Sequence, residues 1–366
     1  MLLVAGAVPG CFRQYVFSRL PQPVIAEAAT PTGLTSLSTA TCAACHVEIA
    51  AEWGETLMGR AWTDPVFQAD FVRGGELYAC RYCHTPLPQQ QPERITGLRS
   101  LKPVAGQGEP NPNFEPSLLS DGVGCAACHV RAGAVVGSLP DLEPPHGVTV
   151  DPGFGDAELC ATCHQASAPP FSRMKRPIAD TVGEWARWQA ATGRTESCVD
   201  CHMPAVERAL TTWTPARPTR SHRVLGGWDD EFVASAIRVG PVERTAGGVA
   251  LTLTNLAGHN VPTADPMRAL DVVVRLGAAP GAPEARTTLE RVVTDRTYVE
   301  SRDTTLLPGE ARVLTLPFAE DSLSTADVVV VELVYDRLRN AAPDIQAVRV
   351  GSTTVATQTV SLPRRP

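Results

Sequence analysis

The sequence repeats one five-residue pattern, Cys-x-x-Cys-His, in the first 202 of its 366 residues. The five copies begin at Cys42, Cys80, Cys125, Cys160 and Cys198. Ten of the eleven cysteines lie in these copies, and the remaining one is Cys11. Because every later cysteine belongs to a copy, chance does not explain the repeat, and the fold of this region must bring five such sites together.

Cys-x-x-Cys-His is the attachment signature of c-type haem. The two thiols add across the vinyl groups of the macrocycle, the spacer sets the distance between the sulfurs, and the histidine supplies an axial nitrogen to the iron. We therefore predict five covalently bound haem c groups. The predicted thioether residues are Cys42, Cys45, Cys80, Cys83, Cys125, Cys128, Cys160, Cys163, Cys198 and Cys201. The predicted proximal iron ligands are His46, His84, His129, His164 and His202.

Three other uses of cysteine compete with haem and explain less of the pattern. Structural zinc would need the Cys-x-x-Cys units to pair, but five is odd, and zinc leaves the recurring histidine unexplained. A redox-active Cys-x-x-Cys pair is typical of a βαβ context that the sequence does not show. Structural disulfides also leave the histidines unexplained.

Length and composition agree with a chain that carries large cofactors. A length of 366 residues favours two domains over one. Aromatic residues make up only 5% of the chain, so we expect the macrocycles to supply apolar core that side chains do not. The formal charge of −7, made more negative by haem propionates, argues against nucleic acid as a partner. It suits redox partner proteins with basic surfaces, where opposite charge mainly raises the association rate.

Haem is attached to c-type proteins outside the cytoplasm, so we expect an exported protein, periplasmic or at the cell surface. The stretch from Met1 to Pro9 is apolar but short and lacks the basic start of a signal peptide, so we expect the true start upstream. Residues 8–11 resemble a lipoprotein cleavage box, although Pro9 fits it poorly. Cys11 is then lipidated and anchors the protein to a membrane; alternatively it is an unmodified residue of a leader. We assign residues 1–40 to leader and tether.

Segments around the copies resemble those of multihaem cytochromes c, in particular the tetrahaem cytochrome c and hydroxylamine oxidoreductase-like group. They are Gly122–Gly133 (GVGCAACHVRAG), Cys198–Pro204 (CVDCHMP), Ser221–Gly227 (SHRVLGG) and the Asp-Thr-x-x-Glu-Trp stretch at 180–185. The resemblance covers nearly the whole chain. It implies that Glu184, Trp185 and Trp188 belong to a helix that packs against porphyrin.

The resemblance also implies distal iron ligands. Relatives carry such ligands where this chain has His146 after two prolines, His222 in the Ser-His segment, and His259 in a Gly-His-x-x-Pro-Thr motif. We predict a helix from Val47 to Trp62, and in its family frame Met58 stands where relatives have a distal histidine. Met58 is therefore a candidate axial ligand or an ordinary apolar side chain, and Met174 is a weaker candidate.

The eight histidines limit the coordination of five irons. Five are proximal, which leaves His146, His222 and His259 for five distal positions. Either one or two haems have His/Met ligation, or at least one iron is open. Met/His ligation raises the reduction potential relative to two histidines. An open iron permits chemistry on nitrite, hydroxylamine or peroxide.

The sequence changes character after about residue 237. Cysteine is absent, and segments rich in β-branched residues at 249–254, 270–276, 312–316, 328–335 and 347–353 predict short strands separated by turns. We predict an α+β multidomain protein: a pentahaem domain at 41–232, mostly helix and loop with little regular structure, followed by an immunoglobulin-like β-sandwich at 233–366.

We expect the protein to carry electrons along five haems in an extracytoplasmic respiratory chain. Catalytic members of the family often have a modified haem site, such as Cys-x-x-Cys-Lys or a tyrosine cross-link. All five motifs here are plain Cys-x-x-Cys-His, which favours a carrier over an enzyme. Two alternatives remain: an oxidoreductase with one open iron acting on a small nitrogen or oxygen compound, and a structural subunit of a larger respiratory complex.

Overall fold

The computed structural model describes residues 29–362, apart from 96–97, 100–101, 104–107, 141–142, 168–173, 175 and 295–297. The chain divides into two compact units. The first unit is formed by Met1–Pro170 and Glu196–Leu225, and the second by Phe171–Thr195 and Gly226–Pro366. The segment from Phe171 to Thr195 therefore groups with the C-terminal part, whereas the predicted boundary at 232/233 placed it with the haem motifs.

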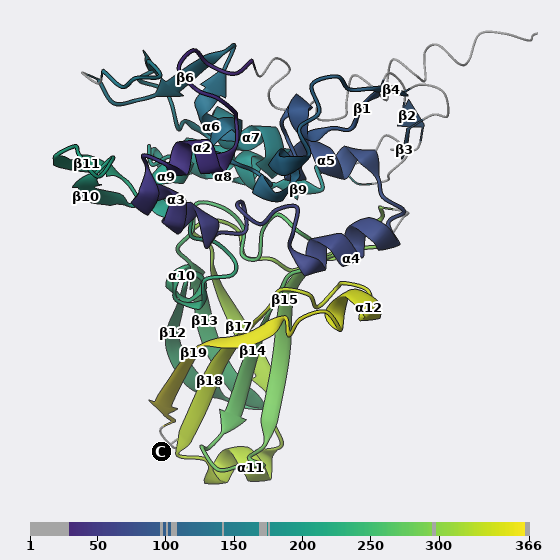
Figure 1. Cartoon of the computed structure of the whole chain (residues 1–366). Coiled ribbons are helices and arrows are strands. Elements are labelled where there is room, and N and C mark those ends of the chain that lie inside the picture. The colour runs from purple at the N-terminus through teal and green to yellow at the C-terminus, as the bar shows by residue number, and fades with distance from the viewer. Residues whose placement is uncertain are drawn as a thin grey trace, which may run out of the picture. The chain divides into compact units, whose positions relative to one another are not determined.

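The first unit is built from short helices joined by long loops (Figure 1). They are α2 (Thr39–Ala43), α3 (Val47–Gly54), α4 (Pro65–Arg73), α5 (Tyr78–His84), α6 (Cys125–His129), α7 (Ala157–His164) and α9 (Cys198–His202), with 3₁₀ turns η1 (Pro88–Gln90) and η2 (Pro116–Asp121). Side-chain caps explain two of the starts. Ser38 accepts a hydrogen bond from the Thr41 amide before α2, and Asp64 accepts from the Val66 amide before α4.

Small strand pairs complete the first unit. They are β1 (Glu93–Ile95) with β4 (Gly108–Pro110), β2 (Leu98–Arg99) with β3 (Lys102–Pro103), β5 (Val130–Arg131) with β6 (Ala134–Gly137) and β7 (Thr149–Val150), and the hairpin β10 (Ala205–Ala209) and β11 (Ala216–Arg220). The buried apolar cluster of this unit is small. It consists of Leu37, Leu87, Leu118, Ala126 and Val130.

The second unit contains two antiparallel sheets. One has three strands in the order β12 (Ile237–Thr245), β13 (Gly248–Asn255), β17 (Ala311–Pro317). The other has five strands in the order β16 (Glu300–Asp303), β15 (Glu284–Val293), β14 (Ala269–Leu276), β18 (Val328–Asp336), β19 (Ser352–Ser361). The helices of this unit are α8 (Thr181–Thr192), α10 (Asp230–Ser235), α11 (Glu320–Thr325) and α12 (Pro343–Gln346).

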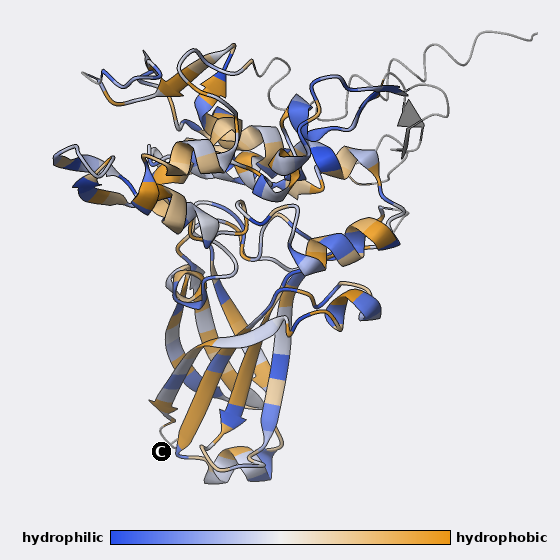
Figure 2. Ribbon diagram, in the orientation of Figure 1, coloured by the Kyte–Doolittle hydropathy of each residue, from blue (hydrophilic) through white to orange (hydrophobic). Residues whose placement is uncertain are grey.

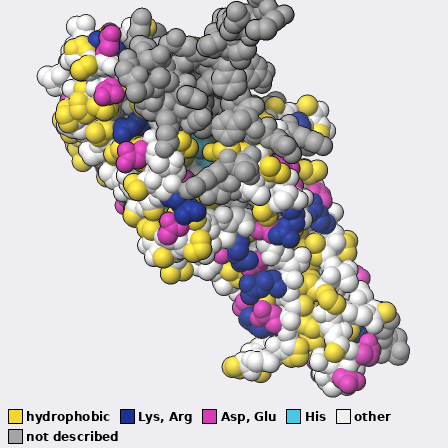
Figure 3. All heavy atoms as spheres, turned by 90° about the vertical axis from the view of Figure 1, so that its right-hand side faces the viewer, with side chains coloured by type: hydrophobic (Ala, Val, Ile, Leu, Met, Phe, Trp, Pro, Cys, Tyr) yellow, Lys and Arg dark blue, Asp and Glu magenta, His cyan; other side chains and the backbone are white. Residues whose placement is uncertain are grey.

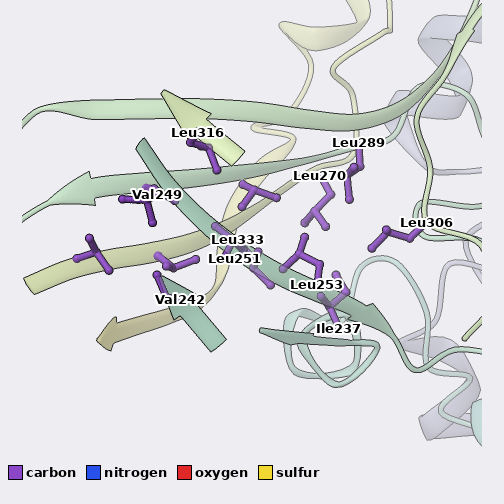
Figure 4. Packing of buried hydrophobic residues seen from close by; sticks show 14 of the residues in the cluster. Ile237, Val242, Val249, Leu251, Leu253, Leu270, Leu289, Leu306, Leu316 and Leu333 are labelled. Atoms are coloured by element: carbon purple, nitrogen blue, oxygen red, sulfur yellow. The ribbon is translucent and has the colours of Figure 1, made fainter. Parts of the chain in front are cut away.

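The two sheets share one large apolar core. In Figure 4, Leu251 and Leu253 of β13 point toward Leu270 of β14 and Leu333 of β18, and all four are at most 1% exposed. Figure 2 shows why these strands are interior: β14 and β18 are largely hydrophobic along their length. The buried apolar cluster of this unit is much larger than that of the first unit, so burial of its own side chains can stabilise it.

Charged side chains of the second unit are arranged as ion pairs. Asp271, fully buried in β14, accepts hydrogen bonds from Arg286 at 2.9 Å and from the Thr288 hydroxyl at 2.7 Å. Figure 3 shows basic and acidic side chains beside one another on one face of the molecule. Such pairing supplies the hydrogen bonds without which a buried carboxylate is costly.

The predicted fold class is wrong. Strands account for about 31% of the described residues and helices for only 27%, and no unit is dominated by helices. The predicted helix at 47–62 shows the reason, because α3 ends at Gly54 and the chain continues as turns. Helical spacing of Ile49, Trp53 and Leu57 was extended through a segment whose glycines favour turns. The strand predicted at 347–353 is also displaced, since β19 begins at Ser352.

None of the helices in the described part of the chain is both long and apolar enough to span a bilayer.

The core of the second unit gives a direct test of its packing. Leu253→Ala should lower the free energy of unfolding of this unit by about 2–5 kcal/mol, because Leu253 is fully buried and its truncation leaves a cavity. Val313→Ala on the neighbouring β17 should cost less than about 1 kcal/mol, because Val313 is 65% exposed. Urea denaturation followed by far-ultraviolet circular dichroism measures both, and equal losses would contradict the packing described.

Candidate functional site

Each Cys-x-x-Cys-His copy forms a single helical turn. Copies two to five lie in α5, α6, α7 and α9, and copy one continues α2, where the His46 amide donates to the Cys42 carbonyl at 2.9 Å. Cysteines three residues apart in a helix project from the same side, so both thiols of a copy can reach one ligand. None of the ten cysteines of the copies forms a disulfide in the described part of the chain. This local geometry fits attachment of one haem to each copy.

Four proximal histidines have their Nδ1 atom fixed by a backbone carbonyl, as seen in the described residues. The pairs are His46 with Leu210 at 2.8 Å, His84 with Ala61 at 2.7 Å, His129 with Val136 at 2.9 Å, and His202 with Leu225 at 2.6 Å. A carbonyl oxygen only accepts, so Nδ1 carries the proton and donates, and Nε2 keeps its lone pair. This is the tautomer and orientation that metal-bound histidines need. His164, at the end of α7, is exposed.

Two predicted distal ligands lie near proximal histidines. The ring centres of His46 and His146 are 6.3 Å apart, and those of His129 and His222 are 6.1 Å apart. A metal–imidazole bond is about 2 Å long, and the bonding nitrogen lies roughly 1 Å from its ring centre, so two rings on opposite sides of one iron have centres about 6 Å apart. Both pairs therefore have the spacing of two axial ligands on one iron.

His146 therefore lies near the proximal histidine of the first copy and His222 near that of the third. The Nδ1 atoms of the distal candidates also face carbonyl oxygens, that of Gly147 for His146 at 2.7 Å and that of Arg220 for His222 at 3.1 Å. Burial lowers the pKa of His129 to about 4 and also lowers the pKa of His222. The sequence indicated these histidines as ligands but contained no signal for how they pair.

Thiols of different copies lie close enough to change each other's pKa. Cys42 lies near Cys125, Cys83 near Cys163, and Cys160 near Cys198. The proximity of Cys160 lowers the pKa of the Cys198 thiol to about 7. Copy one is therefore next to copy three, copy two next to copy four, and copy four next to copy five. Cys128 is close enough to the thiols of copy four to raise their pKa, which joins the third copy to the fourth.

Arg208 gives an independent sign that a further group belongs in the first unit. Its side chain is only 10% exposed, and its Nε atom is a buried donor without a hydrogen-bond partner among the described residues. An orphaned buried donor is costly unless something accepts from it. Arg208 lies beside His222, and the propionate carboxylates of a haem bound in this unit would be acceptors of the kind that its Nε atom lacks. The residues present thus fit the predicted cofactor.

His259 lies in the second unit, in a loop that is fixed on several sides. Its Nδ1 faces the Asn260 carbonyl at 3.0 Å, and its own carbonyl accepts from the Asn255 amide group at 2.8 Å. Glu184 of α8, which is 4% exposed, accepts from the Asn260 amide at 3.0 Å and the Thr263 hydroxyl at 2.6 Å. Burial raises the pKa of this carboxyl group. The assignment of His259 as a distal ligand stays a prediction.

The aromatic residues of α8 serve the same loop. A Cβ atom at Gly258 would lie 3.1 Å from the Trp188 ring and 3.5 Å from the Trp185 ring, so glycine allows the loop to approach the helix. The resemblance to multihaem cytochromes c implies that these residues and Glu184 pack against porphyrin. Their role in holding the His259 loop was missed, because the contacts join positions more than 70 residues apart.

The remaining candidates are less constrained. Met58 lies in the turns that follow α3, where its carbonyl accepts from the amides of Ala61 and Val123. The carbonyl of Ala61 also contacts Nδ1 of His84, so Met58 lies in the same loop as the residue that orients the His84 ring. The role of Met58 as an iron ligand stays a prediction, as does that of Met174. Cys11 lies outside the described residues.

Comparisons with known proteins support the fold. The sequence matches no model of a protein family and no curated protein. Among solved structures, the chain is similar to a penta-haem cytochrome c552 from Thermochromatium tepidum, with a TM-score of 0.65 and 17% identical residues. The similarity covers 91% of this chain and 100% of that cytochrome. The protein therefore has the fold of a multihaem cytochrome c, while the relation to the hydroxylamine oxidoreductase-like group stays a prediction.

The pairing of His222 with the third copy can be tested by ligand exchange. In the haem-loaded protein, His222→Ala should open one iron, so the reduced variant should bind one more equivalent of carbon monoxide per chain than the parent protein. Absorption titration in the Soret region measures this. Arg223→Ala, at the exposed neighbouring position, is the control and should leave the stoichiometry unchanged. An unchanged stoichiometry in His222→Ala with full haem content would contradict the pairing.

Proposed function

We propose that this protein is a multihaem c-type cytochrome that carries electrons along five covalently bound haems. The observation that carries the proposal is the spacing of the two histidine pairs, each suited to hold one iron. Haem supplies one-electron chemistry, since its iron alternates between ferric and ferrous states. The continuity of the five copies, each close to another through its thiols, supports transfer from site to site.

The chain's own residues do three things in this proposal. The cysteines tether each cofactor on a single helical turn. Backbone carbonyls hold the ligand imidazoles in one tautomer, so that Nε2 faces the metal without rearrangement. Burial around His129 and His222 limits access of water, which influences reduction potential. Similarity in fold to a penta-haem cytochrome c552 is further support.

Location and partners follow from the same proposal. Covalent haem attachment implies export, to the periplasm or the cell surface, and a place in a respiratory chain. A net charge of −7 suits redox partner proteins with basic docking surfaces. Lipidation of Cys11, if present, would add a membrane anchor.

A second candidate function is reduction or oxidation of a small nitrogen or oxygen compound at an open iron. The two histidine pairs use His146 and His222, and of the eight histidines only His259 is then left for the irons of His84, His164 and His202. At least two of these three irons therefore lack a second histidine from this chain. This count favours a mixed set of sites, in which methionine or an exchangeable ligand completes the coordination.

Haem content tests the first proposal. Intact-mass spectrometry of the protein made with a c-type maturation system should show the polypeptide plus five haem groups. Cys198→Ser combined with Cys201→Ser should remove one group, because both thioether bonds of the fifth copy are lost. Ser36→Ala, outside the copies, is the control and should retain all five. A parent protein without covalent haem would overturn the proposal.

Carbon monoxide binding by the unmodified protein separates the two candidate functions. If reduced parent protein binds at least one equivalent, an iron is open or weakly ligated, and the oxidoreductase candidate gains support. If none binds, all five irons have two firm protein ligands and the protein is a carrier. Soret titration under anaerobic conditions gives the stoichiometry in either case.

A further inference from the structure

One carboxylate connects three elements of the first unit around His222. Glu52 lies on α3, and its Oε1 accepts from Nη1 of Arg208 on β10 at 2.7 Å. Its Oε2 accepts from the backbone amide of His222 at 2.7 Å and from the Ser221 hydroxyl at 3.3 Å. Hydrogen bonds to a charged acceptor are the stronger kind. Glu52 therefore fixes both the backbone of His222 and the guanidinium beside its ring.

Arg208 completes the surroundings of the His222 imidazole. Its Nη2 donates to the Arg220 carbonyl at 3.1 Å and lies 3.4 Å from Nδ1 of His222. The same carbonyl is 3.1 Å from Nδ1. Because the carbonyl can only accept, the ring donates its Nδ1 proton there, and Nε2 keeps the lone pair. The cation is thus next to the ring, on the side away from the nitrogen available to iron.

Burial makes these charges effective. The Arg208 side chain is 10% exposed and that of Glu52 is 31% exposed, so water screens the guanidinium less than the carboxylate. Charges act more strongly where the local dielectric constant is low. The positive charge also lies nearer the imidazole ring, since Glu52 contacts only the backbone of His222.

The same hairpin also holds the first copy. The carbonyl of Leu210, two residues after Arg208, faces Nδ1 of His46 at 2.8 Å. The hairpin formed by β10 and β11 therefore supports the proximal histidine of copy one and the distal histidine of copy three. These two copies are neighbours through Cys42 and Cys125.

We propose that Glu52 and Arg208 are positioning residues that hold His222 as the distal ligand of the third haem and set the reduction potential of that iron in opposite directions. The inference rests on the proposed function. The charges act through the ligand: a nearby cation favours the ferrous iron, which has one positive charge fewer, and a nearby carboxylate favours the ferric iron.

The test uses the full-length protein with its haems attached. Redox titration followed by electron paramagnetic resonance gives the midpoint potential of each low-spin ferric signal, and the signal lost in His222→Ala identifies the third haem. Arg208→Gln should lower its midpoint potential and Glu52→Gln should raise it. A tenfold change in the ferric-to-ferrous ratio at fixed potential, about 59 mV for one electron, is the expected scale.

Matched variants separate positioning from loss of structure. Glu48→Gln lies one turn earlier on α3, at an exposed position, and should leave the potential unchanged. Arg208→Lys keeps the charge but not the planar guanidinium group. Its midpoint potential should therefore equal that of the parent protein, without the decrease expected for Arg208→Gln. Its signal should be broader, because His222 is held less firmly.

The outcomes distinguish this inference from the proposed function. Five haems with shifts of opposite sign support both. Five haems with shifts of the same sign, or no shift beyond that of Glu48→Gln, overturn the inference and leave the cytochrome intact. If Arg208→Gln does not fold, Glu52→Gln still decides, because a midpoint potential that does not rise in this variant overturns the inference. Fewer than five haems in the parent protein would overturn the proposed function itself.

Discussion

The first unit depends on apolar contact that its own side chains do not supply. Its described core cluster consists of five residues, Leu37, Leu87, Leu118, Ala126 and Val130, two of which are small or β-branched and bury little surface. Folding a unit of this size requires far more apolar burial than that. Five flat macrocycles tethered through ten thiols would provide it. The second unit, with a large leucine and valine core between two sheets, shows what the chain builds where no cofactor is expected.

The orientation of the ligand histidines depends on backbone carbonyls that come from other parts of the first unit. Four proximal imidazoles each contact a carbonyl from another part of the first unit. His46 contacts the hairpin, His84 the turns after α3, His129 the strand β6, and His202 the Leu225 carbonyl. The sites are therefore held by tertiary structure. At His222 a charged pair, Glu52 with Arg208, adds a local electrostatic contribution to this backbone support.

The sequence predicts which residues could bind haem, but it does not predict how those residues are arranged in space. The copies and the histidines that the structure pairs, His146 and His222, follow from motifs whose residues are adjacent in the chain. The proximity of His146 to His46 and of His222 to His129, and the proximity of copies four and five, depend on contacts between residues far apart in the sequence. No local sequence pattern predicts such contacts. The fold class was wrong because helical spacing near Trp53 does not show that α3 ends at Gly54. The roles of Glu52 and Glu184 have no local signal either. A carboxylate on a helix usually faces solvent, and the partners of both residues are distant in the sequence.

Anomalous X-ray scattering at the iron edge from crystals of the haem-loaded protein would test the central claim most directly. Five iron peaks are expected, one of them between His46 and His146 and another between His129 and His222, with continuous density from each macrocycle to its two cysteines. Fewer than five peaks would contradict the five-haem account. An iron bound to His129 with a residue other than His222 on its opposite face would contradict the pairing and the role proposed for Glu52 and Arg208.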